Sequence, residues 1–106
     1  MSKRLLKQKH FLNLLLTTTK EQSSAILKSL TADQLKVILE IISNLSSISS
    51  VPSSTKQLIC RRRRLCKKLL DKNTDLEVKN RLVHKHNRQV LDTLLSARKV
   101  LLDLLK

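Results

Sequence analysis

The sequence predicts an all-α protein, a compact bundle of four to five helices that form a single domain over residues 1–106. Gly is absent and Pro52 is the only proline, so the residues that most often interrupt a helix are nearly missing. Leu, Lys and Arg dominate the composition, and all three favour the helix. Hydrophobic residues make up 41% of 106 residues, which supplies the core of one small domain.

Hydroxyl residues followed three positions later by Glu or Gln indicate where helices begin, because the two side chains can cap each other's backbone N–H groups. The predicted starts are the pairs Thr18–Glu21, Thr31–Gln34, Ser54–Gln57 and Thr74–Glu77. The predicted helices are residues 4–16, 19–30, 32–46, 55–72 and 75–105, the last with a break near His86 and Asn87. A Ser/Pro linker is expected over residues 47–54.

The clearest core pattern lies in the predicted helix 32–46. Its apolar residues repeat at helical spacing, with two more that widen the stripe: Leu35, Ile38, Ile42 and Leu45, then Leu39 and Ile41. Val37 lies outside the stripe, which predicts that more than one face is covered. The last helix has a similar pattern, formed by Val90, Leu91, Leu94, Leu95, Leu101, Leu102 and Leu105. We interpret it as a core helix; a partner-binding helix and a dimer seam are the alternatives.

Charge divides the chain into three parts. Residues 1–16 form a basic N-terminal helix with four cations and no acid, namely Lys3, Arg4, Lys7 and Lys9. Residues 17–46 are neutral, apolar helices, whereas residues 55–106 form a basic helical region with fifteen cations and five acids. The net charge of +14 disfavours compaction and favours a polyanionic partner. Nucleic acid is the first candidate and an anionic membrane surface the second.

Six cations fall within residues 61–68, with no acid among them. On a helical wheel, four of them share one face and apolar residues occupy the other; the four are Arg61, Arg64, Lys67 and Lys68. A merely solvated face is the alternative, but such a face would favour oppositely charged partners four residues apart. Cations on one face can neutralise phosphates along a groove and release counterions. The pattern therefore predicts contact with a polyanion.

Arg62 falls on the apolar side of the same wheel. A buried, unpaired guanidinium is costly. Three alternatives follow: Arg62 extends outward, it pairs with Glu40 or Asp71, or the apolar side is incompletely covered in the monomer.

A second basic surface follows the turn at residues 71–74, so that the two basic helices resemble a helix-turn-helix. Its predicted phosphate contacts are Lys79, Arg81, Lys85 and Arg88, with His84 and His86 nearby. Asn80, Asn87, Arg88 and Gln89 are the candidates for reading bases. Phe11 is the only aromatic residue, which argues against recognition of single strands by stacking.

The sequence predicts no catalytic residue, cofactor or metal. Without Gly it has no phosphate-binding loop, and its acids are scattered singly. Cys60 and Cys66 match no metal-binding spacing with His84 and His86. No signal peptide or apolar stretch long enough to span a bilayer is evident, so we expect an intracellular protein with reduced thiols.

Over roughly residues 11–85, the chain resembles small basic proteins of Polinton/Maverick-type transposable elements and related adintovirus, adenovirus-like sequences. The matching segments are residues 11–15, 24–35 and 39–45, a linker with Val51 and Pro52, and a basic helix that ends at residues 67–70. Members often continue into a Gly-containing apolar tail, which this chain lacks. The resemblance implies a DNA-associated or virion core protein and adds no site residue.

The sequence therefore predicts a non-enzymatic protein that binds and condenses duplex DNA with weak sequence preference, located in the nucleus or a virion. The basic face of residues 61–68 is the main contact, the second basic surface extends it, and the N-terminal cations form an auxiliary arm. A nuclear-localisation role for the block is compatible with this. The alternatives are an assembly module that binds an acidic capsid or chromatin protein, and an amphipathic membrane-surface protein, which the acids of the last helix disfavour. Homodimerisation is a further expectation.

Overall fold

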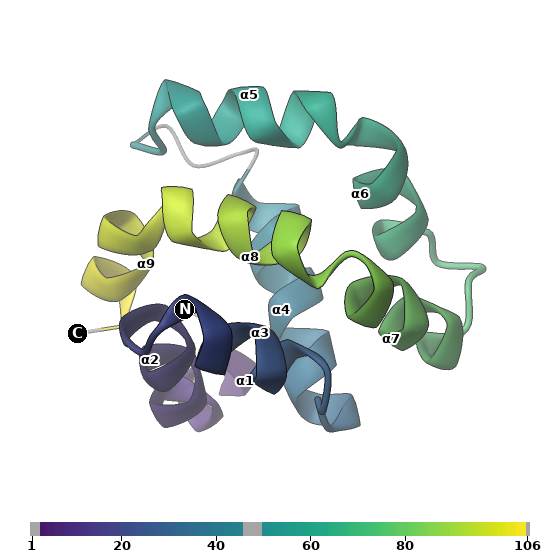
Figure 1. The fold of residues 1–106 in the computed structure, drawn as a ribbon, viewed down its shortest axis with the longest axis horizontal. Helices are drawn as coiled ribbons and strands as arrows, with labels where there is room; N and C mark the ends of the chain where they lie inside the picture. The colour runs from purple at the N-terminus through teal and green to yellow at the C-terminus, as the bar shows by residue number, and fades with distance from the viewer. Residues whose placement is uncertain (1–2, 46–49, 106) are drawn as a thin grey trace.

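The computed structural model describes residues 3–45 and 50–105. Within these ranges the chain forms nine helices and no strand, in a globule whose axes measure 31 × 28 × 26 Å (Figure 1). The helices are α1 (Lys3–Lys7), α2 (Lys9–Thr17), α3 (Lys20–Leu27), α4 (Ala32–Leu45), α5 (Ser53–Arg61), α6 (Arg63–Leu70), α7 (Leu76–Lys85), α8 (Asn87–Ser96) and α9 (Arg98–Leu104). The predicted all-α class is confirmed. The predicted number of four to five helices is wrong.

The additional helices arise because three of the predicted helices are divided by single residues. The break residues are Gln8, Arg62, His86 and Ala97, with φ between −110° and −102° and ψ between 17° and 31°. This sparsely occupied backbone region turns the chain without a glycine or a proline. The predicted break near His86 is confirmed, and the other three breaks were not predicted.

Molecular size explains why the last predicted helix cannot be continuous. A straight helix over residues 75–105 would be about 46 Å long at 1.5 Å per residue. The longest axis of the molecule is 31 Å. Two turns, at His86 and Ala97, divide this segment into α7, α8 and α9, which wrap around the core instead of projecting from it (Figure 1).

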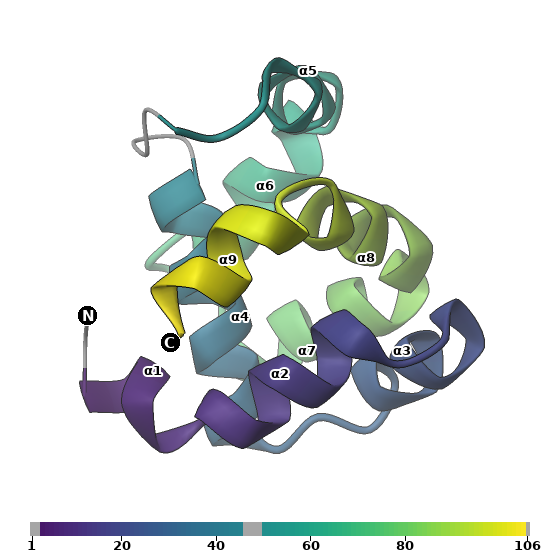
Figure 2. The same cartoon turned by 90° about the vertical axis from the view of Figure 1, so that its left-hand side faces the viewer.

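The core is built around α4, which passes through the molecule beneath α8 in Figure 1 and stands beside α9 in Figure 2. All six predicted core residues of α4 are buried, and Val37 is 0% exposed, so α4 is covered on more than one face as predicted. Five of the seven apolar residues predicted for the last helix are also buried, namely Val90, Leu91, Leu94, Leu101 and Leu105, and the other two are half-buried against the core. The interpretation of the last predicted helix as core is confirmed.

Helix starts follow the sequence signals only in part. At α4 the capping box is complete: Gln34 N–H donates to Thr31 Oγ1 at 3.2 Å, and Thr31 N–H donates to Gln34 Oε1 at 3.0 Å. At α3 the cap is one residue later than predicted, because Thr19 Oγ1 accepts from the N–H of Gln22.

The other two predicted caps are wrong. α5 begins after Pro52 and α7 after Asp75, and neither helix has a side-chain cap. The predicted linker includes residues 47–49, which lie outside the described ranges. The predicted dimer stays a prediction.

Candidate nucleic-acid interface

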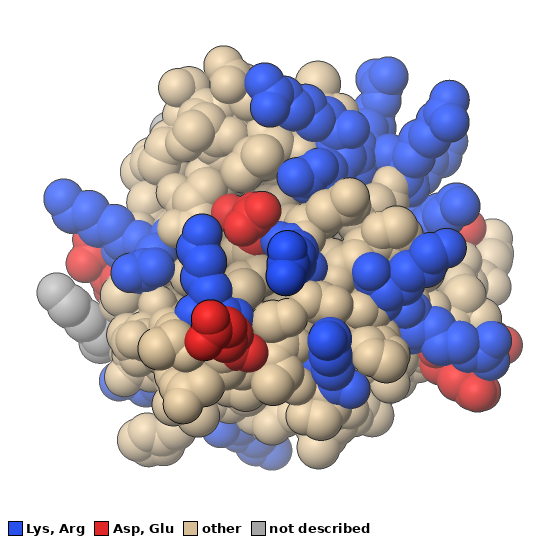
Figure 3. Space-filling view, in the orientation of Figure 1, with Lys and Arg blue, Asp and Glu red and all other residues tan. Residues whose placement is uncertain are grey.

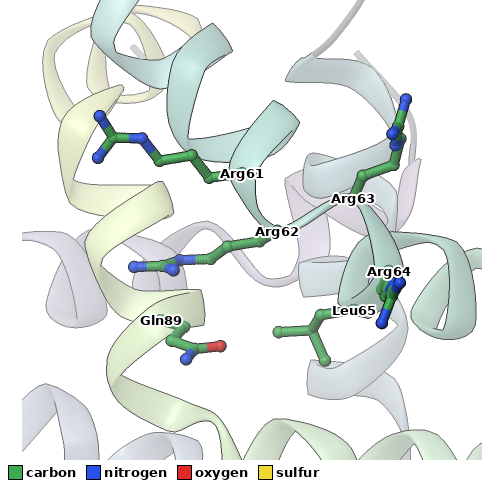
Figure 4. A pocket seen from close by; sticks show the side chains of 6 residues that line it. All are labelled: Arg61, Arg62, Arg63, Arg64, Leu65 and Gln89. Carbon is green, nitrogen blue, oxygen red and sulfur yellow. The ribbon is translucent and has the colours of Figure 1, made fainter.

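The break at Arg62 changes the geometry of the predicted basic face. Arg61 is the last residue of α5, whereas Arg64, Lys67 and Lys68 belong to α6. All four are exposed, but Arg62 separates Arg61 from the other three, and Arg61 and Arg64 leave two different helices in Figure 4. A single face on one continuous helix is therefore wrong, because the wheel assumed that no residue between 55 and 72 leaves the helical conformation.

The apolar side of this segment is only partly covered. Its members Leu58, Ile59, Leu65 and Cys66 are half-buried, Leu69 is buried, and Leu70 is 38% exposed. Burial raises the pKa of the Cys66 thiol, and the nearby positive charge of Arg62 opposes this rise. Incomplete cover was one of the three alternatives for Arg62, and the structure supports it.

Arg62 itself is half-buried, and its Nε is shielded from solvent without a hydrogen-bond partner. In the described residues it forms no ion pair with Glu40 or Asp71. Asp71 Oδ1 instead accepts from Asn73 N–H at 2.9 Å, and Glu40 Oε2 is buried without a partner of its own. Of the three alternatives for Arg62, the pairing with one of these acids is therefore wrong.

A surface hollow of about 340 Å³ lies between the α5–α6 break and α8. Its lining consists of the four arginines 61–64 with Leu65 and Gln89. Figure 4 shows Arg61 and Arg62 extending toward α8, with Gln89 below Arg62, while Arg63 extends away from α8. Among described residues, this lining contains four positive charges and no acid.

A second hollow, of about 320 Å³, adjoins the first because Gln89 lines both. It is lined by Ser24, Lys28, Lys85, His86, Asn87, Arg88 and Gln89. We call these two hollows the cationic groove. Seven cations line the groove in total, four in the first hollow and three in the second, with no Asp or Glu among the described residues there. Figure 3 shows Lys and Arg side chains gathered over α5 and the start of α6, without acidic side chains there.

The groove loses its positive charge at the α3 end. A third hollow shares Ser24 and Arg88 with the second, and its lining adds Lys20, Glu21, Leu91 and Asp92. Two acids there balance two cations. The strongly positive region therefore extends from the α5–α6 break across the start of α8 and ends at α3.

The predicted second basic surface is divided by the fold. Lys85 of α7 and Arg88 of α8 line the groove together. Arg81 instead forms an exposed ion pair with Glu77 at 3.1 Å, and Lys79 is half-buried. Such an exposed pair contributes little to stability and still occupies the guanidinium.

The candidates for base readout also differ in availability. Asn87 uses both ends of its amide internally, since Ser24 Oγ donates to Oδ1 and Nδ2 donates to the carbonyl of His84 at 2.8 Å. Asn80 lines a mainly apolar hollow between α4 and α7. Arg88 and Gln89 remain in the groove. The arrangement offers many phosphate contacts and few side chains for reading bases.

Lys28 is a groove residue that the sequence did not indicate. It belongs to the neutral middle of the chain, where the acids of the same region balance its charge. Only the packing of α3 against α8 brings it beside Lys85 and Arg88. Its single charge gave no sequence signal.

The N-terminal cations lie elsewhere on the molecule. Lys3, Arg4 and Lys7 are exposed on α1, and Lys9 is exposed at the start of α2. In Figures 1 and 2, α1 lies at the bottom and α5 at the top. None of these four cations lines either hollow of the groove.

Among the described residues, no group of three or more His, Cys, Asp or Glu side chains is placed to hold a metal ion. Both cysteines are free thiols, with Cys60 exposed and Cys66 half-buried. No helix in residues 3–45 or 50–105 has the length and apolar character needed to cross a membrane.

Comparison with known proteins adds no assignment. No protein-family model, curated protein or solved structure matches this chain. The resemblance to proteins of Polinton/Maverick-type elements stays a prediction.

Proposed function

We propose that this chain is a small, non-enzymatic protein that binds and condenses duplex DNA through contacts with the phosphate backbone. The observation that carries the proposal is the cationic groove. Seven cations line it without an acid among the described lining residues; they come from α5, the α5–α6 break, α6, α7, α8 and the residue that follows α3. Each phosphate that such a surface neutralises releases condensed counterions, and this release favours binding.

The groove's chemistry supports weak sequence preference. Phosphate contacts fix a protein on DNA without reading its sequence, whereas readout requires donors and acceptors that reach base edges. Asn87, a predicted base reader, is held by Ser24 and the His84 carbonyl. The positions of the lysines and arginines therefore favour binding to many sequences with similar affinity.

A salt titration tests this proposal. Binding of the full chain to two duplexes of unrelated sequence is measured by fluorescence anisotropy at several salt concentrations. We expect similar affinities for the two duplexes and a linear fall of log K with log salt, with a slope of about −0.9 per phosphate contact. A strong preference for one duplex would contradict the weakly specific mode. Absence of binding at moderate salt would contradict the function itself.

Two alternatives predict different outcomes when acidic protein or anionic vesicles are tested beside the duplexes. An assembly module would bind an acidic protein and leave duplex DNA free. A membrane-surface protein would bind anionic vesicles, for which an exposed apolar helix face is required. The apolar residues of α8 and α9 are instead mostly in the core, including Leu94 and Leu101. We therefore favour DNA, in the nuclear or virion setting that the family resemblance implies.

A further inference from the structure

The role of Arg62 goes beyond a general positive charge. It occupies the break between α5 and α6, with φ −105° and ψ 30°. This single non-helical residue directs its side chain toward α8, where the guanidinium lies above Gln89 (Figure 4). Of the four consecutive arginines, Arg62 alone is half-buried; the other three are exposed.

The guanidinium of Arg62 lacks a hydrogen-bond partner for one of its buried N–H groups. Nε is shielded from water and has no hydrogen-bond partner. An unpaired, partly desolvated charge destabilises a folded protein, and the three neighbouring arginines add repulsion. Within the described part of the chain no carboxylate forms an ion pair with it. An anion from outside the protein, bound at the Nη groups, would offset this positive charge.

The first hollow of the groove has the chemistry to receive such an anion. The guanidinium presents parallel N–H donors that match two oxygens of a phosphate. The amide of Gln89 in the same lining can donate a further, uncharged hydrogen bond. Leu65 forms an apolar wall beside them, which lowers the local dielectric and strengthens charge-assisted bonds.

We propose that the hollow between the α5–α6 break and α8 is a discrete site for one phosphodiester of the DNA backbone, with Arg62 as its bidentate contact and Gln89 as a neutral donor. This inference rests on the proposed function and adds a defined position to it. The adjoining hollow, with Lys28, Lys85 and Arg88, then receives neighbouring phosphates of the same strand. The strand follows the start of α8 toward α3.

The test compares two substitutions that keep the net charge of +14, Arg62→Lys and Arg98→Lys. Arg98 is exposed on α9 and lines neither hollow of the groove, so it is the matched control. Lys keeps the charge and removes the planar pair of donors. We expect Arg62→Lys to weaken binding to a short duplex roughly tenfold, and Arg98→Lys to change it by less than about twofold.

A direct measurement on the unmodified protein keeps the inference testable if Arg62→Lys fails to fold. In an NMR titration with the duplex, the side-chain N–H resonances of Arg62 should shift, whereas those of Arg98 should not. If the unmodified chain binds DNA in a salt-dependent way, two results would overturn the discrete site. One is an equal effect of the two substitutions on affinity, and the other is an Arg62 resonance that does not shift. Loss of all DNA binding by the unmodified chain would overturn the proposed function and this inference with it.

Discussion

The helix α4 and the α5–α6 segment show two different uses of helical periodicity in one chain. In α4, seven of fourteen residues are buried, and two acids against one cation give a charge of −1. In residues 53–70, only Thr55 and Leu69 are buried, and seven cations face no acid. Burial determines where α4 lies, whereas α5 and α6 bury few side chains and present their charges to solvent. The basic segment is therefore positioned by the core and contributes little to it.

The largest expected difference between the two regions concerns stability. Ile38 in α4 is 0% exposed, so Ile38→Ala leaves a cavity in a closely packed core. We expect the free energy of unfolding to fall by about 2–5 kcal/mol, as measured by urea denaturation followed by circular dichroism.

The matched substitution in the basic segment is Lys68→Gln, at an exposed position of α6. It should change the free energy of unfolding by no more than about 0.5 kcal/mol, because the substitution leaves the buried side chains in place. A comparable decrease in the two variants would show that the basic segment is part of the stabilising core.

A smaller effect is expected where the basic segment joins the core. Thr55 of α5 is 0% exposed, and its hydroxyl lies 2.7 Å from Ser96 Oγ of α8. Ser96 Oγ donates to the carbonyl of Thr93 at 2.6 Å, so Thr55 is the donor in the Thr55–Ser96 pair. Thr55→Val removes this bond with little change of shape and should cost about 1 kcal/mol of stability.

A double-mutant cycle with Ser96→Ala isolates that bond. The two substitutions should be non-additive, since either one removes the same interaction. Additive effects would mean that α5 is held to α8 by other interactions.

Much of the core side of this comparison could be predicted from the sequence. The spacing of Leu35, Ile38, Ile42 and Leu45 identified the buried face of α4. The apolar stripe of a helix can be read from residues that are only three or four positions apart in the sequence. The capping box at Thr31 and Gln34 likewise involves residues three apart. Even there the signal was ambiguous at α3, where three consecutive threonines allowed a shift of one residue from Thr18 to Thr19.

The groove could not be predicted in the same way. The breaks at Gln8, Arg62 and Ala97 have no Gly or Pro signal in the sequence. The break at Arg62 separates Arg61 from Arg64 and directs Arg62 toward Gln89, which a wheel for one continuous helix cannot show. Lys28 enters the groove only through the packing of α3 on α8.

The most direct test of the account compares two variants with the same net charge. One carries Gln at four exposed cations that line the groove, Arg61, Arg64, Lys85 and Arg88. The other carries Gln at the N-terminal cations, Lys3, Arg4, Lys7 and Lys9. Each variant has four fewer positive charges than the unmodified chain at +14, which leaves +10. Both should retain the helical circular dichroism spectrum, since all eight residues are exposed.

The measurement is the slope of log K against log salt for a duplex of fixed sequence. In the groove variant, the slope should become shallower by about 0.9 for each phosphate that the protein no longer neutralises, and affinity at moderate salt should fall steeply. In the N-terminal variant the slope should stay close to that of the unmodified chain. Equal changes in the two variants would contradict the account, because net charge and not the position of the groove would then determine binding.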